Sequence, residues 1–455
     1  MLVNRVERGR YLDSVALMRI ARRVSELPGV EAAALMIGTP SNKTLLAQAG
    51  LLAPEAQGAE PNDLVIAVRA ANPQPALELA ARLMSEPAAE EHQPLQRART
   101  LDAARALDPQ ANLALISVPG EFAAAEARLA LERGLHAMVF SDNVSLADEV
   151  ALKRLARERG LLMMGPDCGT ALINGAPLAF ANVVPRGDIG IVSASGTGLQ
   201  EVSALIARLG GGVSHGIGVG GRDLDERIGG LGMLAALDAL EADRATRTLV
   251  LISKPPAPRV AREVLARVRR SPKRAVLCFL GADEPGVART LTEAAEAALE
   301  RKLDFTAPAL PKRKGAVRGL FCGGTLAAEA ALVLRAAGAA GECIDLGDDR
   351  YTRARPHPMI EPELRNEHIA RALADQEVGV LLFDVVLGYG SHRDPAGVLV
   401  HALKGSEKPA IASVTGTDAD PQCWSRQVAR LREAGVHVAP SNARAAMLAA
   451  AMVVP

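Results

Sequence analysis

Apolar runs of strand length alternate with helical stretches rich in Ala, Leu, Arg and Glu from one end of the chain to the other. This alternation is typical of parallel β-sheets covered by helices, because two parallel strands need a crossover connection between them. It therefore predicts an α/β protein. The units that begin near Leu101 have the pattern of Rossmann-type βα repeats.

The length of 455 residues exceeds what a single hydrophobic core fills, so we expect several domains. Two polar, proline-containing segments, 85–97 (SEPAAEEHQPLQR) and 302–314 (KLDFTAPALPKRK), have the composition of linkers. We predict a small ferredoxin-like domain over residues 1–90, a Rossmann-like domain over 98–185, and two further α/β domains over 186–301 and 315–455.

Charge and composition exclude several classes of protein. Lys plus Arg and Asp plus Glu both number 52, and no basic tract is interleaved with aromatic residues, so nucleic-acid binding is not predicted. No apolar run reaches the ~18 residues of a membrane span, and the charged start lacks the apolar stretch of a secretory signal. Five cysteines without a C-x-x-C pair suit a reducing compartment. We expect a cytoplasmic protein that binds small molecules or proteins.

Glycine-containing turns follow three of the apolar strands. Ser195-Gly196-Thr197 opens a helix after one strand, and Gly323-Gly324-Thr325 and Gly388-Tyr389-Gly390 follow two others. N–H groups at a helix N-terminus favour anions, and glycine lets a phosphate or carboxylate come close. A turn without a ligand has the same sequence, so each motif alone leaves both interpretations open. Three such turns at strand ends favour at least one anion site.

Three other segments are candidates for substrate binding. Gly220-Gly221-Arg222 belongs to a glycine run that lines a cleft or forms a flexible surface loop. Asp167 and Cys168 lie in a turn after a strand, where we favour a positioning role over a nucleophilic thiol. Arg355 and His357 lie in a charged stretch, 345–358, that we expect to be helix-free. That stretch is either a carboxylate or phosphate clamp or a solvated loop.

Histidine supplies no clear catalytic group. His215 and His392 lie nearest to these turns, and a lone histidine is more often structural than catalytic. Neither has a second histidine at metal-ligand spacing, so no metal site is predicted. The catalytic residues stay unknown at this stage.

From Leu101 to Phe279 the chain resembles the α subunit of succinyl-CoA synthetase. Three synthetase motifs correspond in order and spacing to Gly165–Gly169, Gly190–Thr197 and Gly218–Asp223. The whole chain resembles the FdrA family, which is named as acyl-CoA-synthetase-like. That resemblance rests on Gly38–Lys43, Phe140–Asn143, Gly165–Thr170, Gly221–Leu224, Ser253–Pro256, Asp345–Asp349, Arg355–Pro358 and Val414–Thr417. The resemblance implies that both domains after residue 185 are flavodoxin-like ligase domains.

The chain departs from the synthetases at two places. In the synthetases a histidine carries phosphate and a glutamate in a neighbouring turn orients it. Here the segment Phe279–Pro285 has no histidine and Ser253–Pro256 has no glutamate, so a phosphohistidine relay is not predicted. The Gly-rich turn that holds CoA in the synthetases is replaced by the ferredoxin-like segment, which counts against CoA binding.

The resemblance also implies a site and a reaction. In the synthetases two helix N-termini converge on the phosphate, and here they correspond to Ser195-Gly196-Thr197 and the turn around Gly388-Tyr389-Gly390. The FdrA family is associated with oxamate carbamoyltransferase of allantoin degradation, which interconverts oxalurate and phosphate with oxamate and carbamoyl phosphate. Such phosphorolysis needs electrostatic stabilisation of anions more than a protein nucleophile.

We therefore expect an anion-binding subunit of a carbamoyl- or acyl-transfer complex, with phosphate or carbamoyl phosphate as substrate and no certain cofactor. Its expected partners are other subunits of that complex and further copies of itself, but neither nucleic acid nor membrane. One alternative is an ADP-forming acyl-CoA ligase acting with an ATP-grasp partner. The other alternative is a non-catalytic scaffold that holds partner subunits.

Overall fold

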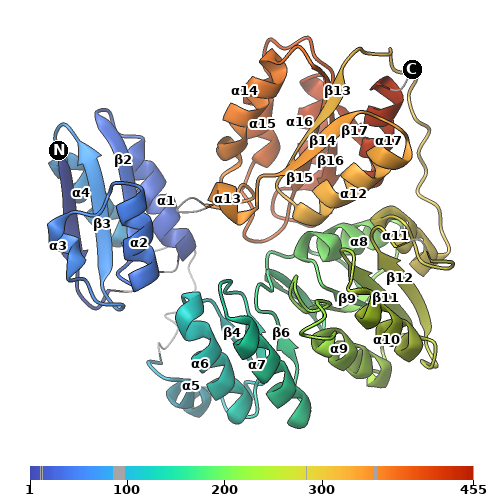
Figure 1. The fold of residues 1–455 in the computed structure, drawn as a ribbon, viewed down its shortest axis with the longest axis horizontal. Coiled ribbons are helices and arrows are strands. Elements are labelled where there is room, and N and C mark those ends of the chain that lie inside the picture. The colour runs from blue at the N-terminus through green and yellow to red at the C-terminus, as the bar shows by residue number, and fades with distance from the viewer. Residues whose placement is uncertain (11, 13, 86–97, 283, 353–355, 454–455) are drawn as a thin grey trace. The chain divides into compact units, whose positions relative to one another are not determined.

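Four β-sheets organise the part of the chain that the structure describes (Figure 1). The structure is a computed structural model that describes residues 1–455 apart from 11, 13, 86–97, 283, 353–355 and 454–455. It divides into two units, one made of Met1–Ala98 with Asp349–His357 and the other of Arg99–Asp348 with Pro358–Pro455. Strands and helices alternate throughout the larger unit, which confirms the predicted α/β class.

The smaller unit is built on an antiparallel sheet in the order β1-β3-β2. Its central strand is buried on both faces, because Ile66 and Val68 pack against α1 and α4 whereas Val65 and Ala67 pack on the side of α2 and α3. The elements are β1 (Leu2–Glu7), α1 (Ser14–Ser25), β2 (Val30–Ile37), α2 (Pro40–Gln48), α3 (Pro54–Gln57), β3 (Leu64–Ala70) and α4 (Gln74–Ser85).

The larger unit begins with a small parallel sheet in the order β4-β5-β6. Helix α6 packs closely on it because Ala123, Ala127 and Ala130 recur at helical spacing and are fully buried. The elements are α5 (Leu101–Leu107), β4 (Leu113–Ile116), α6 (Gly120–Glu132), β5 (His136–Val139), α7 (Leu146–Glu158) and β6 (Met163–Met164).

The next sheet has the strand order β12-β11-β9-β10-β7-β8. Strands β9 to β12 are parallel and the hairpin β7-β8 adds to β10 in the antiparallel sense. Its elements are β7 (Thr170–Ile173), β8 (Ala176–Ala179), β9 (Arg186–Ser193), α8 (Gly196–Arg208), β10 (Val213–Gly218), α9 (Leu231–Ala242), β11 (Thr248–Ser253), α10 (Pro258–Val268), β12 (Arg274–Phe279) and α11 (Leu291–Leu299).

The last sheet is parallel throughout, in the order β14-β13-β15-β16-β17. Its central strand β15 is buried along its whole length, as expected for a strand covered on both faces. The elements are β13 (Ala316–Phe321), α12 (Gly324–Ala336), β14 (Gly341–Asp345), η1 (Pro362–Arg365), α14 (Asn366–Ala374), β15 (Val378–Val386), α15 (Pro395–Leu403), β16 (Ala410–Thr415), α16 (Trp424–Glu433), β17 (His437–Ala439) and α17 (Asn442–Val453).

The last two sheets share one topology. The order β10-β9-β11-β12 in the first corresponds to β14-β13-β15-β16 in the second. An isolated parallel bridge between Leu277 and Val287 stands in the first where β17 lies in the second. Helices α8 and α12 are therefore equivalent, and so are α11 and α17. We call the two parts the first and second ligase-like domains.

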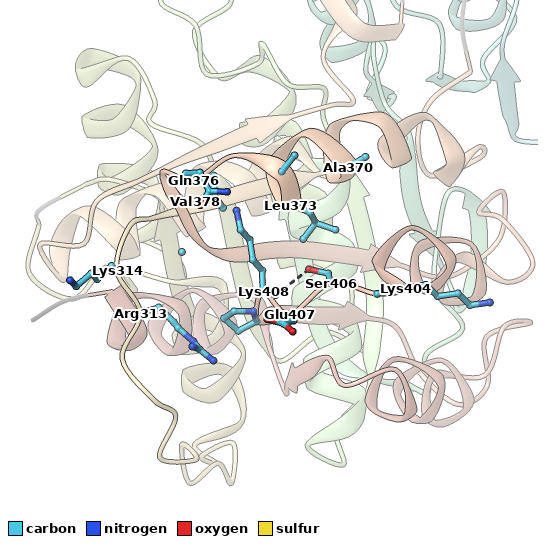
Figure 2. Close-up of a pocket in the computed structure, with 14 residues that line it drawn as sticks. Arg313, Lys314, Ala370, Leu373, Gln376, Val378, Lys404, Ser406, Glu407 and Lys408 are labelled. Atoms are coloured by element: carbon cyan, nitrogen blue, oxygen red, sulfur yellow. Dashed lines mark hydrogen bonds between the residues drawn. The ribbon is translucent and has the colours of Figure 1, made fainter.

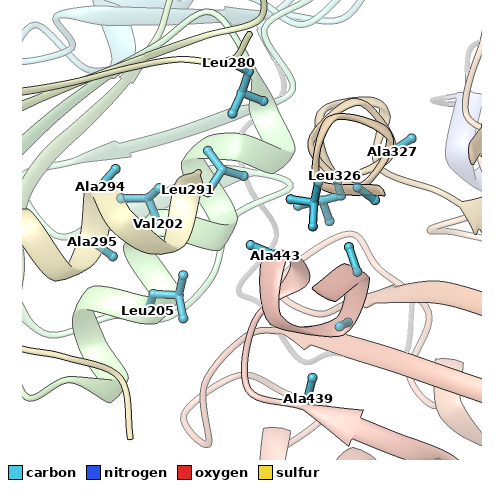
Figure 3. Close-up of a cluster of buried hydrophobic side chains, with 14 of the residues drawn as sticks. Val202, Leu205, Leu280, Leu291, Ala294, Ala295, Leu326, Ala327, Ala439 and Ala443 are labelled. Atoms are coloured by element: carbon cyan, nitrogen blue, oxygen red, sulfur yellow. The ribbon is translucent and has the colours of Figure 1, made fainter. Parts of the chain in front are cut away.

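One hydrophobic cluster joins the two ligase-like domains (Figure 3). Val202 and Leu205 of α8 and Leu291 of α11 belong to the same buried cluster as Leu326 of α12 and Ala443 of α17. Alanines on α11, α12 and α17 let these helices approach closely. The packing fixes the ends of α8 and α12 relative to each other.

The charged stretch 345–358 was expected to be helix-free, and this prediction is wrong. A short helix, α13, covers Asp349–Thr352. An acidic residue in its first turn favours a helix start, and the sequence signal for a helix of this length is weak. Among the residues that the structure describes, no helix combines the length and apolar character needed to cross a membrane.

Candidate functional site

The N-terminus of α8 presents backbone donors at the carboxyl end of β9. Ser195 is the cap residue, and its Oγ accepts a hydrogen bond from Gly198 N at 2.9 Å. The N–H groups of Gly196 and Thr197 have no acceptor within the part of the chain that the structure describes. These two donors, together with the helix dipole, form an electropositive end.

The N-terminus of α12 has a different environment. Cys322 N and Gly323 N donate to the two carboxylate oxygens of Asp384, each at 2.8 Å. Asp384 is fully buried and pairs with Arg365 Nη1 at 2.8 Å, and Arg365 is itself 1% exposed. A carboxylate of the protein therefore binds the two N–H groups that directly precede α12.

The two helix ends meet at a pair of hydroxyls. Ser195 Oγ and Thr325 Oγ1 lie 2.6 Å apart and both side chains are buried. A Cβ on Gly323 would lie 3.1 Å from Thr197 Cγ2, so a glycine is needed for this close approach. The resemblance had paired the Ser195 turn with the turn at Gly388, whereas the structure pairs it with Gly323-Gly324-Thr325.

Two charged side chains from different domains converge on Gly324. Lys254, just after β11, has its Nζ 3.3 Å from where a Cβ on Gly324 would be, and Asp345 Oδ2 would overlap that atom. Asp345 Oδ1 accepts from Gly347 N at 2.9 Å. Burial raises the pKa of Asp345 to about 6, although the Gly347 N–H and Lys254 favour its charged form.

The turn at Gly388-Tyr389-Gly390 is a contact between segments and not an open cradle. Gly388 N donates to Gln422 Oε1 at 3.1 Å, and Tyr389 N donates to Ala181 O at 2.9 Å. A Cβ on Gly388 would overlap Ala181 O, which explains the glycine. Two of the three N–H groups of this turn therefore already have protein acceptors.

Asp167, Cys168, Gly220 and Gly221 lie together. A Cβ on Gly220 would overlap Pro166 O, and one on Gly221 would lie 3.5 Å from Asp167 Oδ2. Cys168 is 2% exposed, and burial raises the pKa of its thiol to about 12. A thiol of this kind stays protonated at neutral pH, so it lacks the property of a nucleophile.

The strand that follows this turn, β7, reaches the N-terminus of α8. Thr170, two residues after Cys168, places its Oγ1 3.0 Å from where a Cβ on Gly196 would be. Thr170 Oγ1 donates to Phe180 O at 2.7 Å, which fixes the hydroxyl beside the helix. The start of β7, just after the Asp167–Cys168 turn, therefore lies against the N-terminus of α8.

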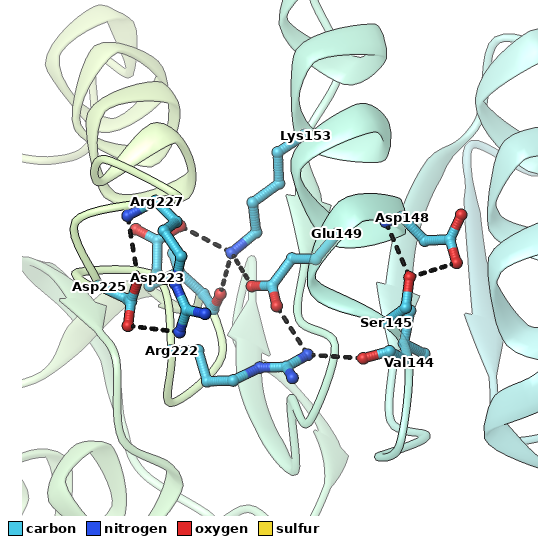
Figure 4. A network of polar contacts seen from close by, with 10 residues as sticks. Val144, Ser145, Asp148, Glu149, Lys153, Arg222, Asp223, Asp225 and Arg227 are labelled. Atoms are coloured by element: carbon cyan, nitrogen blue, oxygen red, sulfur yellow. Dashed lines mark hydrogen bonds and ion pairs between the residues drawn. The ribbon is translucent and has the colours of Figure 1, made fainter.

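Arg222 is part of an ion-pair network that joins α7 to the first ligase-like domain (Figure 4). Its Nη2 lies 2.8 Å from Glu149 Oε2 and donates to Val144 O at 3.0 Å. Lys153 Nζ lies 2.8 Å from Glu149 and 2.7 Å from Asp223, and all three side chains are about 1% exposed or less. The structure thus gives Arg222 a contact between domains, and its predicted role in substrate binding stays a prediction.

The predicted clamp consists of Arg355 and His357. Arg355 lies outside the described residues. His357 belongs with Asp349–His357 to the N-terminal unit, whereas the ligase-like domains form the other unit.

Five charged residues of the interface and site were not predicted. Lys254 and Asp345 lie in motifs shared with the FdrA family, but nothing in the sequence shows that they meet. Asp384 is a lone carboxylate inside an apolar strand, and that pattern is a usable signal. Glu201 and Glu329 lie in the second turns of α8 and α12, where burial raises both pKa values, that of Glu329 to about 7.

The other histidines named in the sequence have local partners. His215 Nδ1 accepts from Asn174 N at 3.0 Å, and its Nε2 lies 3.8 Å from Asp243. His392 Nδ1 accepts from Asp394 N at 3.0 Å.

A hollow of about 650 Å³ lies at the opposite edge of the second ligase-like sheet (Figure 2). Lys314, Lys404 and Lys408 are among the residues that line it, close to the amino ends of β15 and β16. Lys408 Nζ is already bonded to Ala372 O at 3.2 Å. No predicted site residue lines this hollow.

Comparison with known proteins gives matches to both ends of the chain. A family model described as CoA-ligase matches residues 320–453, and one described as AllF, heavy metal-associated domain, matches residues 1–100. The Escherichia coli K12 protein described as uncharacterized protein YahF is 44% identical over 497 aligned positions, covering 96% of each chain.

More distant similarity is confined to part of the chain. The ADP-forming succinate–CoA ligase subunit alpha 2 of Archaeoglobus fulgidus is 28% identical over 151 residues, covering 32% of this chain and 51% of that subunit. A dinucleotide-forming acetyl-coenzyme A synthetase of Ca. Korarchaeum cryptofilum, solved with phosphate and ADP, aligns with a TM-score of 0.31 and 18% identity. That alignment covers 75% of this chain and 82% of the other.

The match to a heavy metal-associated domain raises the question of a metal site. Residues 1–100 contain no cysteine, and their single histidine, His92, lies outside the described residues. Proteins select soft metals with thiolate ligands. Across the described residues, no group of three or more His, Cys, Asp or Glu side chains could hold a metal ion. The N-terminal residues do not fit a soft-metal site, and we assign no metal to them.

Proposed function

Because this chain belongs to the FdrA family and is acyl-CoA-synthetase-like, we propose that it provides the anion-binding active site of a carbamoyl- or acyl-transfer complex. The observation that carries the proposal is the 2.6 Å contact between Ser195 Oγ and Thr325 Oγ1, which joins two helix N-termini at one point. The proposed reaction transfers a carbamoyl group between phosphate and the amide nitrogen of an anion such as oxamate.

The anion is proposed to bind at the α8 side of this point. Gly196 N and Thr197 N have no protein acceptor among the described residues, and Gly196 has no side chain to block them. Lys254 adds a formal positive charge beside Gly324, on the α12 side of the same point. Backbone donors, a helix dipole and a cation are the groups that bind phosphate in many proteins.

The α12 side of the site carries carboxyl groups, one of which is suited to acid–base catalysis. Asp384 binds the two N–H groups just before α12, and Asp345 lies against Gly324 with a pKa of about 6. A carboxyl group with this pKa exchanges its proton near neutral pH. Transfer to or from an amide nitrogen requires such a proton, so Asp345 is the proposed acid–base residue.

Phosphohistidine chemistry is not part of the proposal. Within the described residues the groups that meet at the hydroxyl pair are hydroxyls, carboxylates and a lysine, and no histidine is among them. We propose neither CoA nor a nucleotide as a bound cofactor. An ADP-forming acyl-CoA ligase stays the second candidate because residues 320–453 match the CoA-ligase model.

Binding to the isolated chain tests the site. Calorimetric titration with phosphate, carbamoyl phosphate and oxamate should show saturable binding of at least one of them. Lys254→Met should weaken it by about ten- to a hundred-fold, the effect of losing a charge-assisted contact of roughly 1.5–3 kcal/mol. Lys404→Met, at the opposite edge of the second sheet, is the matched control. Unchanged affinity in the Lys254 variant would exclude this site.

Assay of the assembled complex separates the candidate functions. The chain should be co-purified with the products of neighbouring genes, and phosphate-dependent cleavage of oxalurate should be measured. Loss of activity with the Lys254 variant in an intact complex supports the transferase. CoA- and ATP-dependent acyl-CoA formation would favour the ligase, and full activity of that variant would favour the scaffold.

A further inference from the structure

Strand β4 forms an open edge of the small parallel sheet. It is the end strand in the order β4-β5-β6, and no other described strand pairs with its outer side. His136 N donates to Asn112 O and Phe140 N donates to Ile116 O, each at 2.8 Å. Alternate residues of a strand bond to the same neighbour, so the N–H and C=O groups of Leu113 and Leu115 point outward.

This edge strand is short, but it carries no charged residue and no proline. Its sequence is LALI. Monomeric proteins guard such edges with lysine, proline or a bulge, because unpaired backbone groups recruit another strand. Three of the exposed large apolar side chains of the described residues flank it: Leu107 at 53%, Leu115 at 47% and Phe122 at 39%. An edge that is both unpaired and apolar is suited to a strand partner.

We propose that this edge is a dimer interface at which β4 pairs antiparallel with β4 of a second copy. A two-fold axis at Ala114 sets Leu113 of each copy opposite Leu115 of the other. Both are residues whose backbone groups point outward, so each pair exchanges two hydrogen bonds. Alanine suits the axis, because non-hydrogen-bonded pairs bring Cα atoms within ~4.5 Å.

The flanking apolar side chains favour a second copy over an unrelated strand. Leu107 precedes β4 and Phe122 follows it. Antiparallel pairing of identical strands brings the start of one copy beside the end of the other. Leu107 of each copy then lies at the same end of the paired strands as Phe122 of the other, and the exposed apolar surfaces cover each other.

The strength of the dimer follows from its size. A strand of four residues with three exposed apolar side chains per copy buries less than the ~1,200–2,000 Å² of a standard interface. The dimer therefore dissociates on dilution. The inference does not depend on the proposed reaction.

Analytical ultracentrifugation of the full chain over a range of concentrations tests the inference. Reversible dimerisation is expected for the parent chain. Leu115→Lys should weaken it by about tenfold or more, because it places two ammonium groups in the interface. Met447→Lys changes an exposed apolar residue on α17 in the same way and should leave the dimer unchanged. A strictly monomeric parent, or a dimer insensitive to Leu115→Lys, would overturn the inference.

A cross-link tests the register. Ala114→Cys should form a disulfide-linked dimer under mild oxidation, because its Cα–Cα separation across the axis falls in the range that disulfides span. Met447→Cys controls for chance collisions, and the parent controls for its own cysteines. Absence of a linked dimer above both controls would contradict pairing at Ala114.

Discussion

Glu201 and Glu329 each bind the N-terminus of a helix in the other ligase-like domain. Glu201 Oε1 accepts from Asn442 N, the first residue of α17, at 3.0 Å, and Glu329 Oε1 accepts from Leu291 N, the first residue of α11, at 2.6 Å. Each glutamate lies six positions after the residue that precedes its helix, Ser195 or Gly323. The domains are thus related by an approximate two-fold axis and satisfy each other's helix ends.

Glu329 should make the interface sensitive to pH. Its pKa is raised from 4.5 to about 7, mainly by burial, so folding favours the protonated form. Its stabilising contribution is present below pH 4.5 and is lost as pH rises through about 7, by up to roughly 3 kcal/mol at ~1.4 kcal/mol per pKa unit. Thermal unfolding between pH 5 and 8 should show a falling Tm, and Glu329→Gln should flatten this slope.

The slope is the informative quantity in that experiment. The Glu329→Gln variant would lose one acceptor, because the Glu329 carboxyl group receives hydrogen bonds from Leu291 N and Asn442 Nδ2, so the variant's Tm falls at every pH. Glu367→Gln, on an exposed surface, is the control and should keep the parent slope. An equal pH slope in the parent and the Glu329 variant would contradict the assignment.

The buried network of α7 should be important for stability. Lys153→Met leaves Glu149 and Asp223 buried without their shared cation, and breaking a buried pair in this way costs about 3–5 kcal/mol. A large fall in Tm is expected. Arg371→Met breaks a surface pair with Glu367 in which both side chains are 67% exposed, and it should change Tm little. Similar Tm values for the two variants would show that the network adds nothing.

The missing histidine gives a chemical prediction. Incubation with labelled ATP, with or without an ATP-grasp partner, should leave no acid-labile phosphate on the chain. The reason is that Phe279–Pro285, the segment that corresponds to the phosphohistidine segment, contains no histidine. A succinyl-CoA synthetase treated in parallel is the positive control. Stoichiometric phosphohistidine on any of the eight histidines would support the ligase in place of the transferase.

Gly196 should be required for anion binding. A Cβ at this position lies 3.0 Å from Thr170 Oγ1, and the γ-methyl groups of valine would cover the open N–H groups. Gly196→Val should lower phosphate affinity by at least about tenfold while circular dichroism shows a folded chain. Gly58→Val is the matched control, since no atom lies within 4 Å of its added Cβ. A folded variant with parental affinity would place the pocket elsewhere.

Local sequence patterns predicted the individual strands, helices and turns better than they predicted which of these contact each other. The turn Ser195-Gly196-Thr197 was recognisable because a capping hydroxyl and a glycine follow an apolar strand. Its contact with Thr325 was not predicted, because the meeting of two turns depends on how α8, α11, α12 and α17 pack, through contacts distant in sequence. Gly388 has the same local signature, yet its glycine serves a close contact with Ala181.

Burial also hides functional chemistry from the sequence. Asp384 looks like an interruption of an apolar strand, and only the fold shows that it binds the backbone just before α12 and pairs with Arg365. Lys254 and Asp345 are 91 positions apart by their numbering, 345 minus 254, and no periodicity relates them. They converge on Gly324 because β11 and β14 each end beside the strand that leads into α8 or α12, and these two helix ends meet.

The central claim is that an oxyanion binds where the ends of α8 and α12 meet. A crystal structure determined in the presence of tungstate, a tetrahedral oxyanion with strong anomalous scattering, tests it most directly. We predict an anomalous peak whose oxygens lie within hydrogen-bond distance of Gly196 N and Thr197 N, with Lys254 Nζ turned toward it. A peak only in the lysine-lined hollow near Lys314 and Lys404, with none at Gly196, would contradict the account.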